Sequence, residues 1–381
     1  MAPQTVELVA LGPPASDPYA PAAAAWAVAR AYAQRGASVH VLFPQGTHDE
    51  EPPTGIRATP VPLPLKRPGA ASEEAEFASR VGRHLRPEAD LVVRDPVGVG
   101  PLGVHGHARR AVLVGLARGV ELAEFDRERT GRPGAGFVDR LDGWRDRRVL
   151  RRLERAALEE PAALLCGDPA VAEALSREYR IPPARLRRVL LPVPDLPTPP
   201  TRPQARAALG IPPDVPVVVV PTATAAPDEA GVDRGREAFR RVRPFFPGAR
   251  LIIVGAVGPT DPGVVSVTGR DGPSFAAALS AADVALVVPT RAGFDPGIVF
   301  AARAGCATIA YRSAAGPLLP ESAVRTVSAE DPGDLASALA ELVADLGAAR
   351  ELAARGQKFA DGFRPEELLR AVDELSAARV G

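Results

Sequence analysis

The chain has 381 residues, more than one hydrophobic core usually organises, so its length predicts two domains. It carries 46 basic and 46 acidic residues, and this balance argues against a protein that binds nucleic acid. The two cysteines, Cys166 and Cys306, lie far apart in apolar runs, which excludes a disulfide framework or a cysteine zinc site and indicates buried thiols. No metal and no cofactor are expected.

The chain begins MAPQTVELVALGPP, which passes directly into a strand-like run and lacks the charged and long apolar regions of a signal peptide. No window reaches the about 18 uninterrupted apolar residues that a membrane-spanning helix needs. A transmembrane segment is therefore not expected. The expected localisation is cytoplasmic, either free or peripheral to a membrane.

Short β-branched runs alternate with Ala-, Leu- and Arg-rich helical patterns through the first half of the chain. Strands are predicted at residues 6–11, 39–43, 91–93, 111–114, 163–166 and 189–191. Helices are predicted at residues 21–34, 73–85, 137–158 and 169–179. This alternation is typical of stacked βαβ units and indicates an α/β protein with a parallel sheet covered on both faces.

A proline-rich stretch, LPVPDLPTPPTRPQ at 191–204, removes backbone donors and predicts an extended linker. Strands are predicted beyond it at residues 217–220, 251–254, 284–288 and 307–311. Helices are predicted at residues 233–242, 273–280, 296–304, 334–346, 348–359 and 365–378. Two Rossmann-like domains in tandem are expected, and two such domains that face each other imply one cleft between them.

Three motifs of the second half have a recognisable order and spacing, namely GVDRGREAF at 231–239, RVRPFFPGARLIIVG at 241–255 and LSAADVALVVPTRAGFDPGIVFAARAGCATIAY at 279–311. The chain resembles the family-4 retaining glycosyltransferases in these motifs, and more weakly in the first half, through LLCGDPAVAEAL at 164–175.

The resemblance implies a GT-B fold, with two Rossmann-like domains whose parallel sheets face each other across a nucleotide-sugar cleft. The acceptor-type domain would comprise residues 1–195 and the nucleotide-sugar-donor-type domain residues 196–364. A C-terminal helix in residues 365–381 would cross back to the N-terminal domain.

Donor-site residues that the resemblance implies are replaced in this sequence. The family's Arg and Lys, which hold the donor pyrophosphate, correspond to Ala225 and Ala230, and its two Glu, near the sugar and on the ribose, correspond to Ala292 and Phe300. A hydrogen bond to a charged group contributes roughly 1.5–3 kcal/mol, so losing both cations forfeits about 3–6 kcal/mol. That loss is about two to four decades of affinity.

The N-terminal half shows the same pattern of replacement. The family's Gly-Gly pair at the start of the first helix corresponds to Tyr19 and Ala20, so bare backbone is missing there. The His that follows the fifth strand corresponds to Ala117, and the Asn-Gly before the linker to Val193 and Pro194.

The remaining phosphate contact implied by the resemblance is the loop Gly293, Phe294, Asp295 and the helix after it, whose free N–H groups favour an anion. Asp295 is predicted as the N-cap, with Pro296 at the first helical position. The Asp295 carboxylate would take the N–H groups that a phosphate needs. The sequence therefore predicts that Asp295 excludes phosphate, and the alternative is that Asp295 is only a helix cap.

Other side chains could take over the lost contacts. Guanidinium groups bind phosphate bidentately, which makes Arg234, Arg236, Arg291 and Arg303 candidates, with Arg291 favoured by its place beside the lost carboxylate. Asp95, in a turn at the carboxyl end of a predicted strand, is the candidate catalytic residue, or only a residue that faces the cleft.

The most charged stretch is residues 121–160, where both signs alternate at helical spacing. This pattern predicts a solvated helix with i,i+4 ion pairs, and the alternative is a partner or acceptor surface formed by Phe125, Phe137 and Trp144. The HGH motif at 105–107 has i,i+2 spacing without a third ligand nearby, so it does not predict a metal site.

Loss at five or more donor-site positions favours a pseudo-glycosyltransferase, a partner or regulator of an active glycosyltransferase or a homodimer. The alternative is an active glycosyltransferase whose donor contacts have moved to Arg291, Arg303 or Asp95. A nucleotide-sugar is an expected ligand only in that alternative. A third hypothesis is a binding protein for another small ligand in the interdomain cleft.

Overall fold

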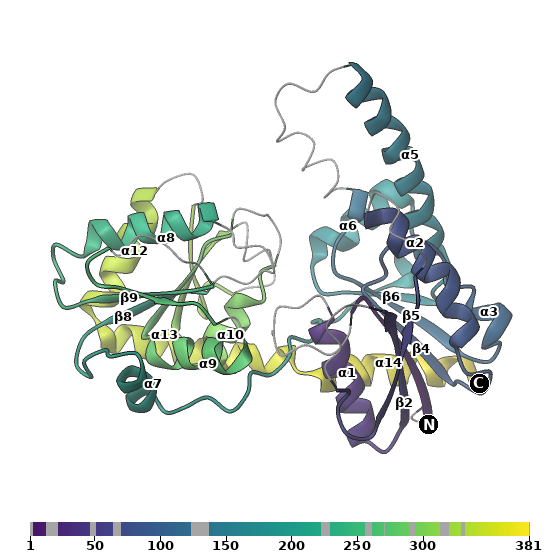
Figure 1. The fold of residues 1–381 in the computed structure, drawn as a ribbon, viewed down its shortest axis with the longest axis horizontal. Coiled ribbons are helices and arrows are strands. Elements are labelled where there is room, and N and C mark those ends of the chain that lie inside the picture. The colour runs from purple at the N-terminus through teal and green to yellow at the C-terminus, as the bar shows by residue number, and fades with distance from the viewer. Residues whose placement is uncertain are drawn as a thin grey trace. The chain divides into compact units, whose positions relative to one another are not determined.

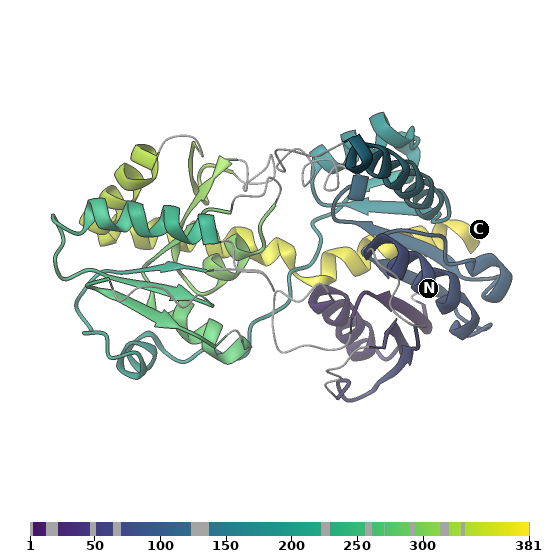
Figure 2. The ribbon, with the colours of Figure 1, turned by 45° about the horizontal axis from the view of Figure 1, so that its top comes forward.

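The computed structural model describes residues 3–12, 22–45, 51–63, 70–122, 137–221, 229–255, 261–269, 271–289, 294–312, 320–328 and 332–380. The chain forms two compact α/β units, which Figures 1 and 2 show from two directions. The first unit consists mainly of Pro21–Pro192 and Pro365–Gly381, and the second mainly of Val193–Arg364. The predicted α/β class is confirmed.

A seven-stranded sheet forms the centre of the first unit, in the order β3-β2-β1-β4-β5-β6-β7, and its strands pair in parallel. Its strands are β1 (Thr5–Ala10), β2 (Ser38–Pro44), β3 (Ile56–Val61), β4 (Leu91–Asp95), β5 (Val112–Ala117), β6 (Ala163–Cys166) and β7 (Leu186–Arg188). The inner strands β4, β5 and β6 are buried throughout, as expected of a parallel sheet covered on both faces.

Helices cover both faces of this sheet. They are α1 (Ala23–Gln34), α2 (Ala70–Val81), α3 (Val104–His107), α5 (Phe137–Glu159), α6 (Pro169–Tyr179) and α14 (Pro365–Val380), with short 3-10 turns η1 (Gly82–His84) and η2 (Pro183–Arg185). Trp26 of α1 shares one core with Leu368 and Val372 of α14, and the two helices lie side by side in Figures 1 and 2. Phe77 of α2 packs in a separate core with Leu42.

The second unit contains a six-stranded parallel sheet in the order β10-β9-β8-β11-β12-β13. Its strands are β8 (Val217–Val220), β9 (Arg250–Val254), β10 (Val264–Val267), β11 (Val284–Val287), β12 (Ala307–Tyr311) and β13 (Arg325–Val327). Its helices are α7 (Arg202–Ala208), α8 (Glu229–Val242), α9 (Gly272–Ala281), α10 (Gly297–Arg303), α12 (Pro332–Ala344) and α13 (Leu346–Ala360), with the 3-10 turn η4 (Asp361–Phe363). Phe239 of α8 and Leu339 of α12 pack with Ile253 in one core.

Some sequence-based boundaries are wrong. The strand predicted at 189–191 is absent, because pairing with β6 is made by Leu186–Arg188 and the chain then enters a segment with prolines, which cannot donate to the sheet. Strands β3, β10 and β13 and helix α7 were not predicted. β3 contains Pro60, which is tolerated because β3 is an edge strand.

Within the described residues, no helix has the length and apolar character to cross a bilayer. The same part of the chain contains no group of three or more His, Cys, Asp or Glu side chains placed to hold a metal ion. His105 and His107 lie exposed on the single turn of α3.

Candidate functional site

Phe300 occupies the position where the resemblance implies a ribose-binding carboxylate. It lies on α10 and is 0% exposed. Its ring meets the ring of Phe275 on α9 edge to face, with centroids 5.7 Å apart and planes at 82°. The position therefore contributes to the interior of the second unit rather than to a surface that could bind hydroxyl groups.

Asp295 does cap the chain before α10, but not in the predicted register. The helix begins at Gly297 with Pro296 as its N-cap, one residue later than predicted, because the Pro296 carbonyl already accepts helical hydrogen bonds from Val299 at 3.0 Å and Phe300 at 3.1 Å. The Asp295 carboxylate accepts the N–H of Gly297 at 2.7 Å. A protein carboxylate thus takes one N–H at this helix start.

Phe294, which precedes this cap, is held by a small aromatic cluster. Its ring stacks on the ring of Phe363 in η4, with centroids 5.0 Å apart and planes at 2°. Phe359 of α13 contacts the same Phe363 ring edge to face at 5.2 Å. These ring contacts hold Phe294, which lies just before α10, against α13 and η4.

Arg303 lies at the last turn of α10, and its side chain is 12% exposed. It donates hydrogen bonds from Nη1 to the carbonyls of Val193 at 2.9 Å and Pro194 at 3.0 Å. The same nitrogen lies 3.3 Å from the Asp195 carboxylate. Arg303 therefore anchors the beginning of the linker at Val193 and Pro194, where the resemblance implies an Asn-Gly pair.

Only some of the other predicted site residues belong to the part of the chain that the structure describes. Ala230 is exposed in the first turn of α8 and carries no charge. Arg234 lies over the ring of Tyr311, 5.6 Å from its centroid, and Arg236 is 3.9 Å from Asp233. Outside the described residues lie Tyr19, Ala20, Ala225, Arg291, Ala292 and Gly293.

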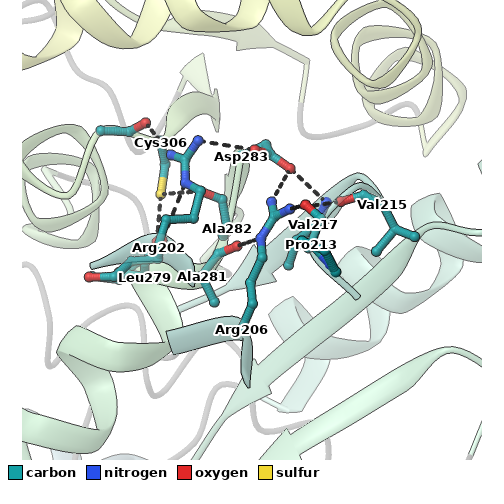
Figure 3. A network of polar contacts seen from close by, with 12 residues as sticks. Arg202, Arg206, Pro213, Val215, Val217, Leu279, Ala281, Ala282, Asp283 and Cys306 are labelled. Carbon is teal, nitrogen blue, oxygen red and sulfur yellow. Dashed lines mark hydrogen bonds and ion pairs between the residues drawn. The ribbon is translucent and has the colours of Figure 1, made fainter. Parts of the chain in front are cut away.

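Asp283 belongs to the motif at 279–311 and lies directly before β11, where it organises a network of polar contacts (Figure 3). Its carboxylate contacts Arg206 at 2.8 Å and Arg202 at 3.2 Å, and it accepts the N–H of Val217 at 2.9 Å. Arg206 also donates to the carbonyl of Ala281 at 2.9 Å. The network ties α7 to β8 and β11, so this acidic residue has a structural task.

Asp95 ends β4 in the first unit, and its side chain is 1% exposed. Both carboxylate oxygens accept hydrogen bonds from Arg118, at 2.5 Å and 2.8 Å. Burial lowers the pKa of Arg118, but the Asp95 carboxylate outweighs burial, so that pKa is raised overall. The candidate catalytic carboxylate is therefore engaged in a bidentate ion pair.

A cavity of about 130 Å³ adjoins this pair at the carboxyl ends of β4 and β5. Its walls include Gly98, Arg118 and Glu154. Glu154, on α5, is buried and accepts the N–H groups of Glu121 at 2.7 Å and Leu122 at 3.0 Å. Its carboxylate also accepts a hydrogen bond from the hydroxyl of Tyr179.

Buried charges also hold the loop that follows β4. Arg94 donates to the carbonyls of Gly100 at 2.5 Å and Val99 at 3.0 Å. Burial lowers the pKa of Arg94 to about 10, against the opposing effect of Glu74 and Glu160. Arg94 thus holds two carbonyls of the loop whose residues Pro96, Val97 and Gly98 line the cavity.

Sequence reasoning missed Arg118, the partner of Asp95. The signal was available, because Arg118 follows the strand next to β4 and the carboxyl ends of neighbouring parallel strands meet at one sheet edge. Glu154 was not distinguishable from the other charges of its helix, since its burial depends on how α5 packs.

Comparisons with known proteins identify the fold. Residues 22–194 match the family model described as Glycosyltransferase Family 4. WaaG, a glycosyltransferase involved in lipopolysaccharide biosynthesis, is 18% identical with a TM-score of 0.69, over 96% of this chain and 98% of that one. The predicted resemblance to the family-4 glycosyltransferases is confirmed. The family match covers the half in which the motif resemblance is weaker.

Two further GT-B structures extend over the whole chain. Sucrose-phosphate synthase from Thermosynechococcus elongatus is 17% identical with a TM-score of 0.70, over 98% of this chain and 100% of that one. Anabaena HepE in complex with UDP and glucose is 14% identical with a TM-score of 0.67, over 98% of this chain and 99% of that one. The GT-B fold is thus confirmed for both units. A search of curated protein sequences found no match.

Proposed function

We propose that this chain is a pseudo-glycosyltransferase, a GT-B protein that does not bind a nucleotide-sugar at the family's donor position. It would act through a protein partner, either an active glycosyltransferase in glycan or glycoconjugate assembly or a second copy of itself. The observation that carries the proposal is the burial of Phe300, which is 0% exposed and packed against Phe275.

The ribose carboxylate of the family is a charged group that must reach the ligand. A buried phenyl ring at that position has no hydrogen-bonding atom, and a carboxylate there would need a partner to offset its desolvation. The surrounding residues belong to the apolar interior, so Phe300 is held by packing and not by a ligand.

The charges around the lost site support the same conclusion. Ala225 and Ala230 supply no cation for the pyrophosphate, and Asp295 carries an anion that already accepts the N–H of Gly297. Arg303, one of the candidate substitutes, donates to the carbonyls of Val193 and Pro194. Together these contacts favour a retained scaffold over a relocated donor site.

Titration calorimetry of the purified chain with UDP, GDP, ADP and their sugars tests the proposal. We expect no dissociation constant below about 100 µM, because two cationic contacts worth about 3–6 kcal/mol are missing. A low-micromolar dissociation constant would reject the proposal in favour of an active transferase with moved contacts. In that event Arg291→Ala should abolish binding if Arg291 supplies the moved contact.

A further inference from the structure

Phe245 is the more exposed of two large hydrophobic side chains that lie open to solvent among the described residues, with 78% of its surface accessible. It lies in the turn between α8 and β9, at the edge of the second sheet where β8 and β9 begin. A single exposed apolar side chain is common on protein surfaces, so the neighbours of Phe245 decide what its exposure means.

These neighbours are apolar as well. Pro244 and Pro247 flank Phe245 in the turn, and both are exposed. The segment that leads from α7 into β8 lies beside this turn, since Arg250 donates its N–H to the carbonyl of Pro216 at 2.9 Å. The exposed apolar residues of the two segments form one surface, which we call the amino-edge patch and which consists of Pro212, Pro213, Pro244, Phe245 and Pro247.

Hydrogen bonds hold the turn in a fixed conformation. The N–H of Phe245 donates to the carbonyl of Val242 at 3.1 Å, and Nη1 of Arg250 donates to the carbonyl of Gly248 at 2.7 Å. An aromatic side chain on a fixed backbone loses little conformational freedom when it is buried against a partner. The patch is therefore already arranged for a contact.

The α8 side of the patch is basic. Residues 237–250 contain four arginines and one acid. Arg240 and Arg241 are 63% and 48% exposed and share the carboxylate of Glu237, at 2.6 Å and 3.0 Å. Asp261 lies 3.7 Å from Arg240, whereas Arg241 has only its share of Glu237. Arg241 can thus accept a further carboxylate.

The α7 side of the patch is acidic. Asp214 is the only charged residue at 209–216, it is exposed, and it forms no ion pair within the described part of the chain. Helices α7 and α8 lie on opposite faces of the second sheet (Figures 1 and 2). The free carboxylate of Asp214 and the guanidinium of Arg241 therefore border Phe245 on opposite sides.

A surface with an apolar centre and opposite charges on its two sides is complementary to a second copy of itself. In a contact with two-fold symmetry, residue i of one copy meets residue j of the other, and j meets i. If Phe245 lies at the axis, the two rings pack together, and Arg241 of each copy faces Asp214 of the other copy. Charge-assisted pairs around a central aromatic contact are the usual composition of a protein interface.

We propose that the chain forms a symmetric dimer through the amino-edge patch, with Phe245 at its centre and two Arg241–Asp214 pairs at its border. The patch lies at the amino ends of β8 and β9, so the carboxyl ends of these strands remain outside the interface. A second copy is one of the two partners that the proposed function admits, and this choice rests on it only in that respect. A dimeric chain that bound UDP tightly would reject the proposed function and leave the dimer intact.

Sedimentation equilibrium of the full chain tests the dimer. The parent should be dimeric at about 100 µM and dissociate on dilution, as a small interface does. Phe245→Ser removes both central rings and should raise the dissociation constant at least about 100-fold. Val149→Ser, at the other exposed hydrophobic side chain, is the matched control and should change it by less than about twofold. Thermal unfolding checks that both variants remain folded.

Charge reversal tests how the two copies are oriented. Arg241→Asp and Asp214→Arg each place like charges opposite one another twice in the dimer, so each should raise the dissociation constant at least about tenfold. The two changes together restore opposite charges across the axis and should return it to within about threefold of the parent value.

Three results would overturn the proposal. The first is a parent chain that stays monomeric at about 100 µM, which would leave Phe245 to a different protein. The second is an equal loss of association in Phe245→Ser and Val149→Ser. The third is a double charge variant that associates no better than the weaker of its two single variants, because the proposed pairing requires mutual rescue.

Discussion

Phe300 and Phe275 pack edge to face inside the second unit, with ring centroids 5.7 Å apart. This pair fills the position where the resemblance to the family-4 glycosyltransferases implies a carboxylate on the ribose. An interior of this kind is close-packed, so the site cannot be restored by exchanging one side chain without disturbing its neighbours.

Placing a carboxylate at position 300, as the resemblance implies for the family, should damage the fold. Phe300→Glu removes a buried ring and places an ionisable group among apolar neighbours. The free energy of unfolding should therefore fall by at least as much as in a buried Phe→Ala change, which costs about 3–5 kcal/mol. Urea unfolding measures this loss. Phe300→Leu keeps the position apolar and should cost clearly less. A Phe300→Glu protein as stable as the parent would show that the position is not core.

The network around Asp283 should be among the most sensitive polar sites of the second unit. Asp283→Ala leaves Arg206 buried without its anionic partner, and breaking a buried ion pair in this way typically costs about 3–5 kcal/mol. The exposed pair Arg312–Glu321, at 3.2 Å, provides the matched control, where Glu321→Gln should change the free energy of unfolding by less than about 1 kcal/mol. Similar losses in the two variants would contradict a structural role for Asp283.

Glu74 predicts a pH dependence of stability in the first unit. Burial raises the pKa of Glu74, Arg94 opposes this, and Oε1 of Glu74 is buried without a hydrogen-bond partner. The pKa of Glu74 is therefore higher in the folded state than in the unfolded state. At a pH below the ordinary pKa of about 4.3 the protonated carboxyl favours the folded state, and this advantage is lost as the pH rises through the folded-state pKa.

Glu74→Gln should therefore raise the melting temperature at pH 7 by about 2 °C or more, and the difference should disappear near pH 4. Thermal unfolding followed by circular dichroism across this range measures the effect. Glu73→Gln, at an exposed neighbouring position, serves as the control and should show no such trend. If Glu74→Gln stabilised the protein equally at both pH values, titration of Glu74 could not be the cause of the stabilisation.

Restoring the donor cations alone should not restore phosphate binding. Ala225→Arg with Ala230→Lys returns the charge, but a bound phosphate would still meet the Asp295 carboxylate, and like charges about 4 Å apart cost about 4 kcal/mol at an effective dielectric of about 20. Adding Asp295→Gly should therefore give measurably tighter binding of nucleoside diphosphate than the double change. Equal affinities of the double and triple variants in calorimetry at one salt concentration would mean that Asp295 is only a cap.

Val217–Val220 and Ala163–Cys166 have the predicted bounds, because each is a short apolar run in an alternating α/β pattern. An apolar run is not sufficient by itself, since residues 189–191 form no strand. β13, with the sequence RTV, has an exposed arginine and only three residues, so its place in the sheet depends on pairing with β12. Local pattern alone does not contain that information.

For the candidate site, the resemblance implies a carboxylate at position 300, and this stays a prediction. The packing of Phe300 against Phe275 could not be predicted from the sequence, because it depends on how α9 and α10 lie relative to each other. Asp95 is correctly placed at the end of a strand, whereas its ion pair with Arg118 follows from the order of β4 and β5 in the sheet. Contacts between distant segments therefore account for most of what was missed.

The first unit is built from both ends of the chain, since Leu368, Leu369 and Val372 of α14 complete the core that begins with Trp26 of α1. A ribosome must translate all of residues 193–364 before it adds these side chains. The second unit can therefore finish its sheet on the nascent chain while the earlier unit still lacks part of its interior. A premature stop after residue 364 would release a protein with a complete second unit and an open first one, so only full-length chains acquire a closed first core.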